Sequence, residues 1–169
     1  REANYVKGKL DMLVVDYWPN GNKKEEAEYF EDNLDGSFES WHENGQKKLK
    51  VNYVGGEKEG LYEKWYSDGQ IAVKGQLIEG KWEGLMEEWH ENGKKKMQLN
   101  LRDAKLNGVQ RAYHENGQKR SETYFKDDKE EGLHIKEIFE FLVRQDPKLA
   151  ESQFGNDPRK MKQWMTEMD

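Results

Sequence analysis

The feature that most constrains this chain is an internal repeat with a period of 24 residues. Four series of residues follow the period in one register. Two are glycine series: Gly36, Gly60, Gly84, Gly108 and Gly132, and Gly21, Gly45, Gly69, Gly93 and Gly117. The other two are Tyr17, Trp41, Trp65, Trp89 and Tyr113, and Tyr5, Tyr29, Tyr53, Leu77, Leu101 and Phe125. A repeat of this length predicts an array of like units, each packed on its neighbours.

The period divides the chain into a half unit and five full units. The half unit is residues 1–11, and the full units are residues 12–35, 36–59, 60–83, 84–107 and 108–131. A sixth unit begins at Gly132 but lacks the aromatic residue and the Asn-Gly pair that should follow. The sequence therefore predicts a repeat domain over residues 1–132 and a different structure over residues 133–169.

Each full unit has the pattern of a β-hairpin. Its first arm carries aromatic residues, and a turn that reads ENG, SDG or PNG follows. Asn-Gly and Asp-Gly favour tight hairpin turns, because the type I′ turn needs positive φ at both central residues. The second arm alternates, as in Leu49, Val51 and Tyr53, so these side chains share one face of a strand. The predicted fold class is mainly β: one elongated antiparallel sheet of about ten strands, two for each full unit.

The units resemble the variant MORN repeat, whose name stands for membrane occupation and recognition nexus. The segments that match it best are GLYEKWYSDGQ (60–70), GLMEEWHENGKKK (84–96) and YHENGQKR (113–120), and the resemblance covers about residues 4–132. It implies a scaffold without catalytic activity that acts in protein–protein contact and oligomerisation, and lipid binding is also attributed to such proteins. The variant repeat is common in bacterial proteins, including a family labelled as antitoxins, which implies neutralising a toxin by direct binding.

After Gly132 the apolar spacing changes to that of a helix. The residues spaced at i, i+3, i+4 and i+7 are Ile135, Ile138, Phe139 and Leu142. This spacing predicts an amphipathic helix, and Asp146-Pro147 then has the form of an N-cap with proline at the first helical position. We expect residues 133–169 to form a small α-helical extension, which either caps the sheet or binds a partner.

The residue types for catalysis or metal binding do not come together in a recognisable motif. The chain has no cysteine, which excludes thiolate ligands and cysteine nucleophiles. His42, His90 and His114 share one repeat position, but units are about 10 Å apart, so only the last two could approach one ion. Acid pairs are expected by chance among 34 acidic residues, and no nucleophile stands beside a base. We expect no catalytic residue, no cofactor and no metal.

Two neighbouring positions of the repeat hold the candidate partner-binding residues, because Trp and Tyr are over-represented among binding hot spots. One position holds Trp18, His42, Tyr66, His90 and His114. The other holds Trp41, Trp65, Trp89 and Tyr113. Consecutive strand residues face opposite sides, so one series can pack between units while the other contacts a partner. The alternative is that both series pack, since a sheet poor in aliphatic residues needs its rings for stability.

The charge of the chain narrows the class of partner. A net charge of −6 disfavours nonspecific binding to nucleic acid or to an anionic membrane, and it suits a basic protein surface. We expect a non-catalytic protein-binding module, of which an antitoxin or immunity protein is the most concrete form. The alternatives are a membrane-surface scaffold and a homo-oligomeric structural protein. The compartment stays open between the cytoplasm and export after loss of a signal peptide before Arg1.

Overall fold

The structure is a computed structural model that describes residues 5–6, 9–10 and 12–130 of the 169-residue chain. The chain divides into two units after Lys129, and the description below is of the first. The helical extension expected over residues 133–169 lies outside the described residues. Within the described ranges there is no helix that is long and apolar enough to cross a membrane.

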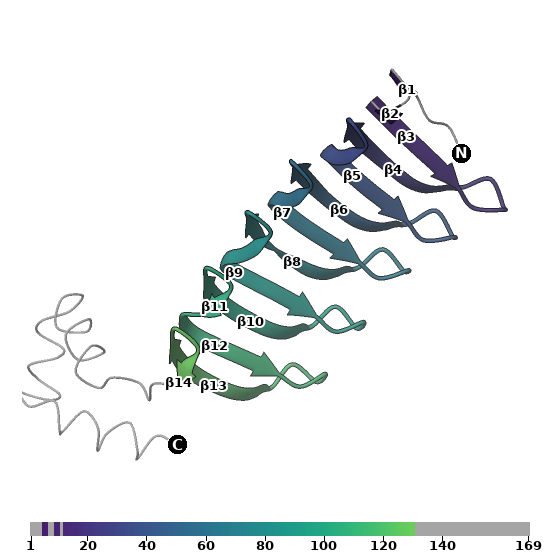
Figure 1. Ribbon diagram of the computed structural model, residues 1–169. Coiled ribbons are helices and arrows are strands. Elements are labelled where there is room, and N and C mark those ends of the chain that lie inside the picture. Colours follow the sequence, from purple (N-terminus) through teal and green to yellow (C-terminus); the bar gives the residue numbers. More distant parts are fainter. Residues whose placement is uncertain (1–4, 7–8, 11, 131–169) are drawn as a thin grey trace, which may run out of the picture. The chain divides into compact units, whose positions relative to one another are not determined.

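The described residues form antiparallel strands (Figure 1). The longer strands are β3 (Met12–Tyr17), β4 (Lys23–Phe30), β5 (Asn33–Trp41), β6 (Lys47–Val54), β7 (Glu57–Trp65), β8 (Ile71–Ile78), β9 (Lys81–Trp89), β10 (Lys95–Arg102), β12 (Gly108–Tyr113) and β13 (Lys119–Lys126). Four strands have two residues each: β1 (Tyr5–Val6), β2 (Lys9–Leu10), β11 (Lys105–Leu106) and β14 (Lys129–Glu130). Strands β3 to β14 make one sheet of 12 strands, and β1 pairs with β2.

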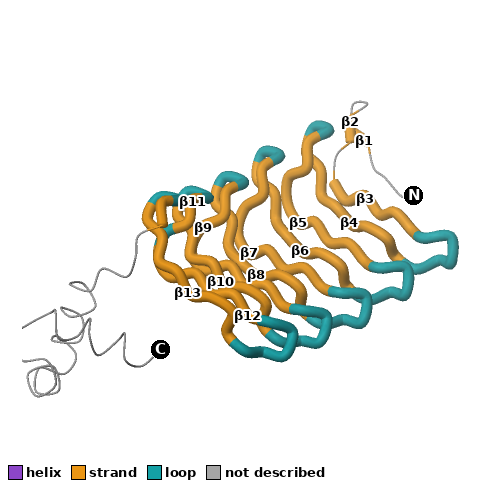
Figure 2. The backbone as a smooth tube through the Cα atoms, turned by 90° about the horizontal axis from the view of Figure 1, so that it is seen from below, coloured by secondary structure: helices purple, strands orange, loops and turns teal. Residues whose placement is uncertain are grey.

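Within the main sheet, consecutive strands are neighbours except at β11, because β11 and β12 both pair with β10. This order confirms the predicted antiparallel array of hairpins. The tight turn within each hairpin lies along one edge of the sheet, and the loops that join successive hairpins lie along the opposite edge (Figures 1 and 2). Each first arm therefore pairs with its own second arm on one side. On the other side it pairs with the second arm of the preceding unit, as β5 does with β6 and β4.

The tight turn is present in every full unit, but its type differs from the prediction. In the second unit the Gly45 N–H donates to the His42 carbonyl at 2.9 Å, and Gly45 has φ 86° while Asn44 does not have positive φ. A type I′ turn would need positive φ at two central residues. The loop is instead a four-residue β-turn that ends on a left-handed glycine, next to a register shift between Ser40 and Trp41.

One face of the sheet carries the core, and we call it the apolar face. Its central row takes one residue from each of the ten longer strands. In strand order these residues are Val14, Ala27, Phe38, Val51, Tyr62, Gly75, Met86, Leu99, Gln110 and Thr123. Among the described residues the sheet has no second layer, and large rings cover parts of this face, as Trp82 does at Gly75. Phe38 meets Tyr53 edge-on at a centroid distance of 5.8 Å, and Tyr62 meets Trp82 at 5.1 Å.

Candidate functional site

The first candidate series joins each hairpin to the next by a hydrogen bond, and we call it the linking series. The polar atom of its side chain reaches the backbone carbonyl oxygen 23 residues further on. The bonds join Trp18 Nε1 to Trp41, His42 Nε2 to Trp65, Tyr66 Oη to Trp89 and His90 Nε2 to Tyr113, at 3.2, 3.0, 2.6 and 3.1 Å. Because a carbonyl oxygen can only accept, the side-chain nitrogen or oxygen is the donor in each bond. The faces of the rings stay available for other contacts. His114, the last member, is exposed.

Removing one linking bond should cost stability without changing the fold. Tyr66→Phe keeps the ring and deletes the donor, leaving the Trp89 carbonyl without its bond from Tyr66. We expect the free energy of unfolding to fall by about 1 kcal/mol, the usual net value of such a bond, measured by urea denaturation. His114→Phe is the matched control, because no further hairpin follows it in the described sheet, and its effect should stay below about 0.5 kcal/mol. Equal losses in the two variants would contradict the linking role.

The second candidate series lies on the opposite side of the sheet, which we call the charged face. The Lys23 ammonium lies 4.9 Å from the centre of the Trp41 ring and also pairs with Glu26. Trp41, Trp65, Trp89 and Tyr113 are half-buried, and the Tyr113 hydroxyl donates to Gln98 Oε1 at 3.1 Å. The structure thus separates the two candidate series between the two faces, and one flat partner surface cannot cover both.

A row of charges crosses the centre of the charged face, and sequence reasoning missed it. Its members lie directly opposite one another on successive strands: Glu26, Glu39, Lys50, Glu63, Lys74, Glu87, Gln98, Arg111 and Glu122. We call it the ionic row. Three of its pairs are salt bridges: Glu39–Lys50 at 3.2 Å, Glu63–Lys74 at 2.9 Å and Glu122–Arg111 at 2.7 Å. The 24-residue spacing of Glu39, Glu63 and Glu87 was the signal that could have revealed it.

Three carboxylates of the ionic row, those of Glu39, Glu87 and Glu122, have a pKa below the ordinary value for Glu. The hydrogen bond from Lys95 lowers the pKa of Glu87 below its ordinary value, against the opposing effect of burial. Arg111 does the same for Glu122, whose pKa is also lowered. A carboxylate with a lowered pKa in the folded protein stabilises the fold once the pH exceeds its unfolded value, about 4.3 for Glu. The stabilisation is lost as the pH falls through the folded-state value.

Acid should therefore lower the stability of this sheet, and protonation of the ionic-row carboxylates should account for part of the loss. We expect the urea midpoint to be steady near neutral pH and to fall below about pH 4.5, as the carboxylates protonate. Glu87→Gln should lower stability at neutral pH and flatten the acid dependence, whereas Glu43→Gln, at an exposed turn outside the row, should leave the acid dependence unchanged. An identical pH profile for Glu87→Gln and the unsubstituted chain would contradict the assignment.

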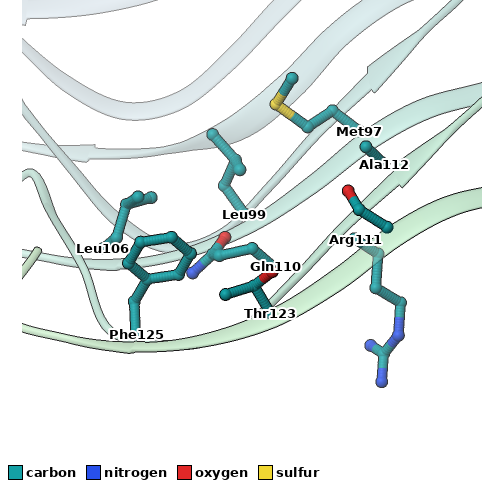
Figure 3. Close-up of a pocket in the computed structure, with 9 residues that line it drawn as sticks. Met97, Leu99, Leu106, Gln110, Arg111, Ala112, Thr123 and Phe125 are labelled. Atoms are coloured by element: carbon teal, nitrogen blue, oxygen red, sulfur yellow. The ribbon is translucent and has the colours of Figure 1, made fainter. Parts of the chain in front are cut away.

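The apolar face has a hollow of about 240 Å³ at its C-terminal end, on β10 to β13 (Figure 3). The hairpin of β12 and β13 contributes small side chains to the lining, those of Ala112, Ser121 and Thr123, beside the larger Met97 and Phe125. The neighbouring Gln110 is buried, and its amide bonds both the N–H and the carbonyl of Asn100 at 2.9 Å.

No charged group faces into this hollow from the residues that line it. Arg111 contributes to the lining, but its guanidinium points away from the other side chains (Figure 3) and pairs with Glu122. The arrangement suits an uncharged apolar group, because a charged one would lose its hydration there without gaining a counter-ion. The volume is below the range usual for drug-sized ligands, about 300–1,000 Å³, so an apolar side chain of a partner fits it better.

The described side chains show no arrangement for metal chemistry. Within the part of the chain that the structure describes, no three His, Asp or Glu side chains lie close enough together to hold an ion. His42 and His90 point their Nε2 atoms at separate carbonyl oxygens, those of Trp65 and Tyr113. The described side chains instead form ring contacts, apolar contacts and ion pairs.

An open array of like hairpins, each bonded to the next, defines this protein as a repeat protein with nearest-neighbour packing. A family model of the MORN repeat variant matches five consecutive segments, residues 10–31, 34–54, 58–78, 82–103 and 106–127. These segments make up more than half of the chain, which therefore belongs to the MORN repeat variant family. The resemblance in the sequence is thus confirmed. No curated protein sequence matches this chain.

Proposed function

We propose that the protein is a non-catalytic repeat module that binds a protein partner along the apolar face of its sheet. The observation that carries this proposal is the uncharged hollow beside Gln110 and Phe125. It suits one apolar side chain of a partner, as the buried centre of an interface requires. Tyr66 of the linking series lies near Glu88 and Lys96. Glu88 follows Glu87 of the ionic row on β9, so it faces the apolar side of the sheet.

The experiment is affinity capture with the full chain and two matched variants. Ala112→Phe fills the hollow, and Ser37→Phe adds the same ring at an exposed position on the charged face. We expect one stoichiometric protein to bind the unsubstituted chain and Ser37→Phe, and to be lost with Ala112→Phe. Equal capture by all three baits would place binding elsewhere on the molecule. Absence of any protein partner, together with sedimentation on liposomes, would favour a membrane-surface role instead.

An antitoxin or immunity role is the narrower form of the proposal, and its support is the resemblance to the antitoxin-labelled family. In that form the partner is a toxin encoded beside this chain, and binding neutralises it. Coexpression should then restore growth of cells that make the toxin, and Ala112→Phe should not restore it. Failure to rescue cells from any neighbouring gene product would remove the antitoxin form and leave protein binding in place.

A further inference from the structure

The charged face carries a patch of exposed apolar side chains that the proposed function does not use. Val54, Leu61, Ile78 and Leu85 are 57, 45, 47 and 48% exposed. They lie on four adjacent strands, β6 to β9, in the middle of the sheet. Each stands an even number of positions from the ionic-row residue of its strand, so all four share the charged face. We call them the outer apolar patch. A patch across neighbouring strands marks an interaction surface more often than scattered apolar residues do.

The charges beside the patch alternate in a way that complements itself. On β6 to β9 the ionic row reads Lys50, Glu63, Lys74 and Glu87. Consider a two-fold axis that runs parallel to the strands and passes between β7 and β8. It exchanges β7 with β8 and β6 with β9, and it keeps every residue at its height along the strand. Each acid then faces a base of a second copy, and each base faces an acid.

We propose that two copies of this chain pack charged face to charged face about this two-fold axis. Glu63 of one copy lies over Lys74 of the second, and Lys50 lies over Glu87 of the second. The rotation also brings the outer apolar patch onto its own copy, so the interface is isologous. Face-to-face sheets stack about 10 Å apart with their strands within about 30° of each other, so the contact is confined to the middle strands.

The apolar patch and the ionic row have different parts in this dimer. Burial of the four apolar side chains supplies the driving force. The ionic row is already paired within the chain, with Glu63–Lys74 at 2.9 Å, Lys50–Glu39 at 3.2 Å and Glu87–Lys95 at 2.9 Å. A second copy adds a further opposite charge to each group, which offsets the loss of hydration. The charges therefore fix the register and orientation of the two copies more than they add affinity.

The dimer uses the face opposite to the hollow, so it is independent of the proposed partner site. Each copy of the dimer presents its apolar face outward, and the hollow near Phe125 lies on that face. A dimer of this kind would hold two partner molecules at a fixed separation. Failure of the dimer leaves the capture experiment with Ala112→Phe unaffected, and failure of capture leaves the dimer unaffected.

The test is a mixing experiment with two charge reversals in the full chain, Lys50→Glu and Glu87→Lys. The two residues lie on β6 and β9 with two strands between them, so they do not meet within one chain. The unsubstituted protein should show a concentration-dependent dimer in sedimentation velocity. Each variant alone should associate at least about 100-fold more weakly, because two like-charge contacts replace two opposite ones. An equimolar mixture should dimerise again, because each chain now supplies the charge that the other needs.

The mixture separates the interface from folding. Lys50→Glu also disturbs the pair with Glu39, but a chain that failed to fold would not be rescued by mixing. As a second probe, Leu61→Asp should abolish the dimer, whereas Leu13→Asp, at an exposed leucine on β3 outside the patch, should not. A monomeric unsubstituted protein at high concentration, variants that dimerise normally, or a mixture that stays monomeric would each overturn the proposal.

Discussion

Replacing Val51 by Asp should remove most of the stability of the sheet. Val51 is 2% exposed, the largest fully buried side chain among the described residues, and it lies opposite Phe38 on the neighbouring strand. A carboxylate there would lose its hydration, and the side chains around it on the apolar face are rings and aliphatic groups. We expect a loss of about 3–5 kcal/mol, against a total of about 5–15 kcal/mol for a typical domain.

The measurement is urea denaturation followed by circular dichroism, with Asn52→Asp as the matched control. Asn52 is the next residue on the same strand, but it is exposed on the charged face. The same carboxylate at this position should change the free energy of unfolding by less than about 0.5 kcal/mol. Similar losses in the two variants would mean that Val51 is not the centre of the core.

The hairpin array could be predicted because its signals are local. Gly45 and its equivalents recur at a fixed spacing beside Asn or Asp, and each pair marks one turn. The turn type could not be read in the same way. It depends on the register shift between Ser40 and Trp41, which only the pairing of β5 with β6 reveals. The Asn-Gly or Asp-Gly pair therefore predicted the positions of the turns correctly and their type incorrectly.

The role of the linking series needed the distance between hairpins, which the sequence does not contain. Trp18, His42 and Tyr66 were predicted to contact a partner because Trp and Tyr are common among binding hot spots. What they share is a side-chain N–H or O–H at similar reach, and each bonds a carbonyl of the next hairpin. A repeat position that varies in shape but keeps a donor therefore indicates a bond between units.

The hollow, the outer apolar patch and the ionic row were not predicted from the sequence, for a different reason. Alternation in Leu49, Val51 and Tyr53 shows that these side chains share a face, but both faces of this sheet carry apolar residues. Which face is covered depends on the rings that lie across it, as Tyr62 and Trp82 do. Exposure of Leu61 and Leu85 on the other face is therefore a property of the folded sheet and not of the pattern.

Gly75→Val should destabilise the protein, and a second substitution should recover part of the loss. A Cβ at Gly75 would lie 2.8 Å from Trp82 Cζ3 and 3.2 Å from Met86 Cγ, closer than carbon atoms pack. Overpacking of this kind costs about 1–3 kcal/mol. In the preceding unit the positions equivalent to Gly75 and Trp82 hold Val51 and Lys58. Valine therefore already occurs at this repeat position, together with a flexible lysine in place of the tryptophan ring.

The rescue is Trp82→Lys in the same chain. Alone it should also destabilise, because the Trp82 ring packs edge-on against Tyr62. Together with Gly75→Val it should cost at least about 1 kcal/mol less than the two separate losses added, since the ring that the new methyl groups would strike is gone. Urea denaturation of the four proteins gives the coupling. Strictly additive losses would mean that the Trp82 ring moves aside for valine. In that case the tryptophan would not require glycine at position 75.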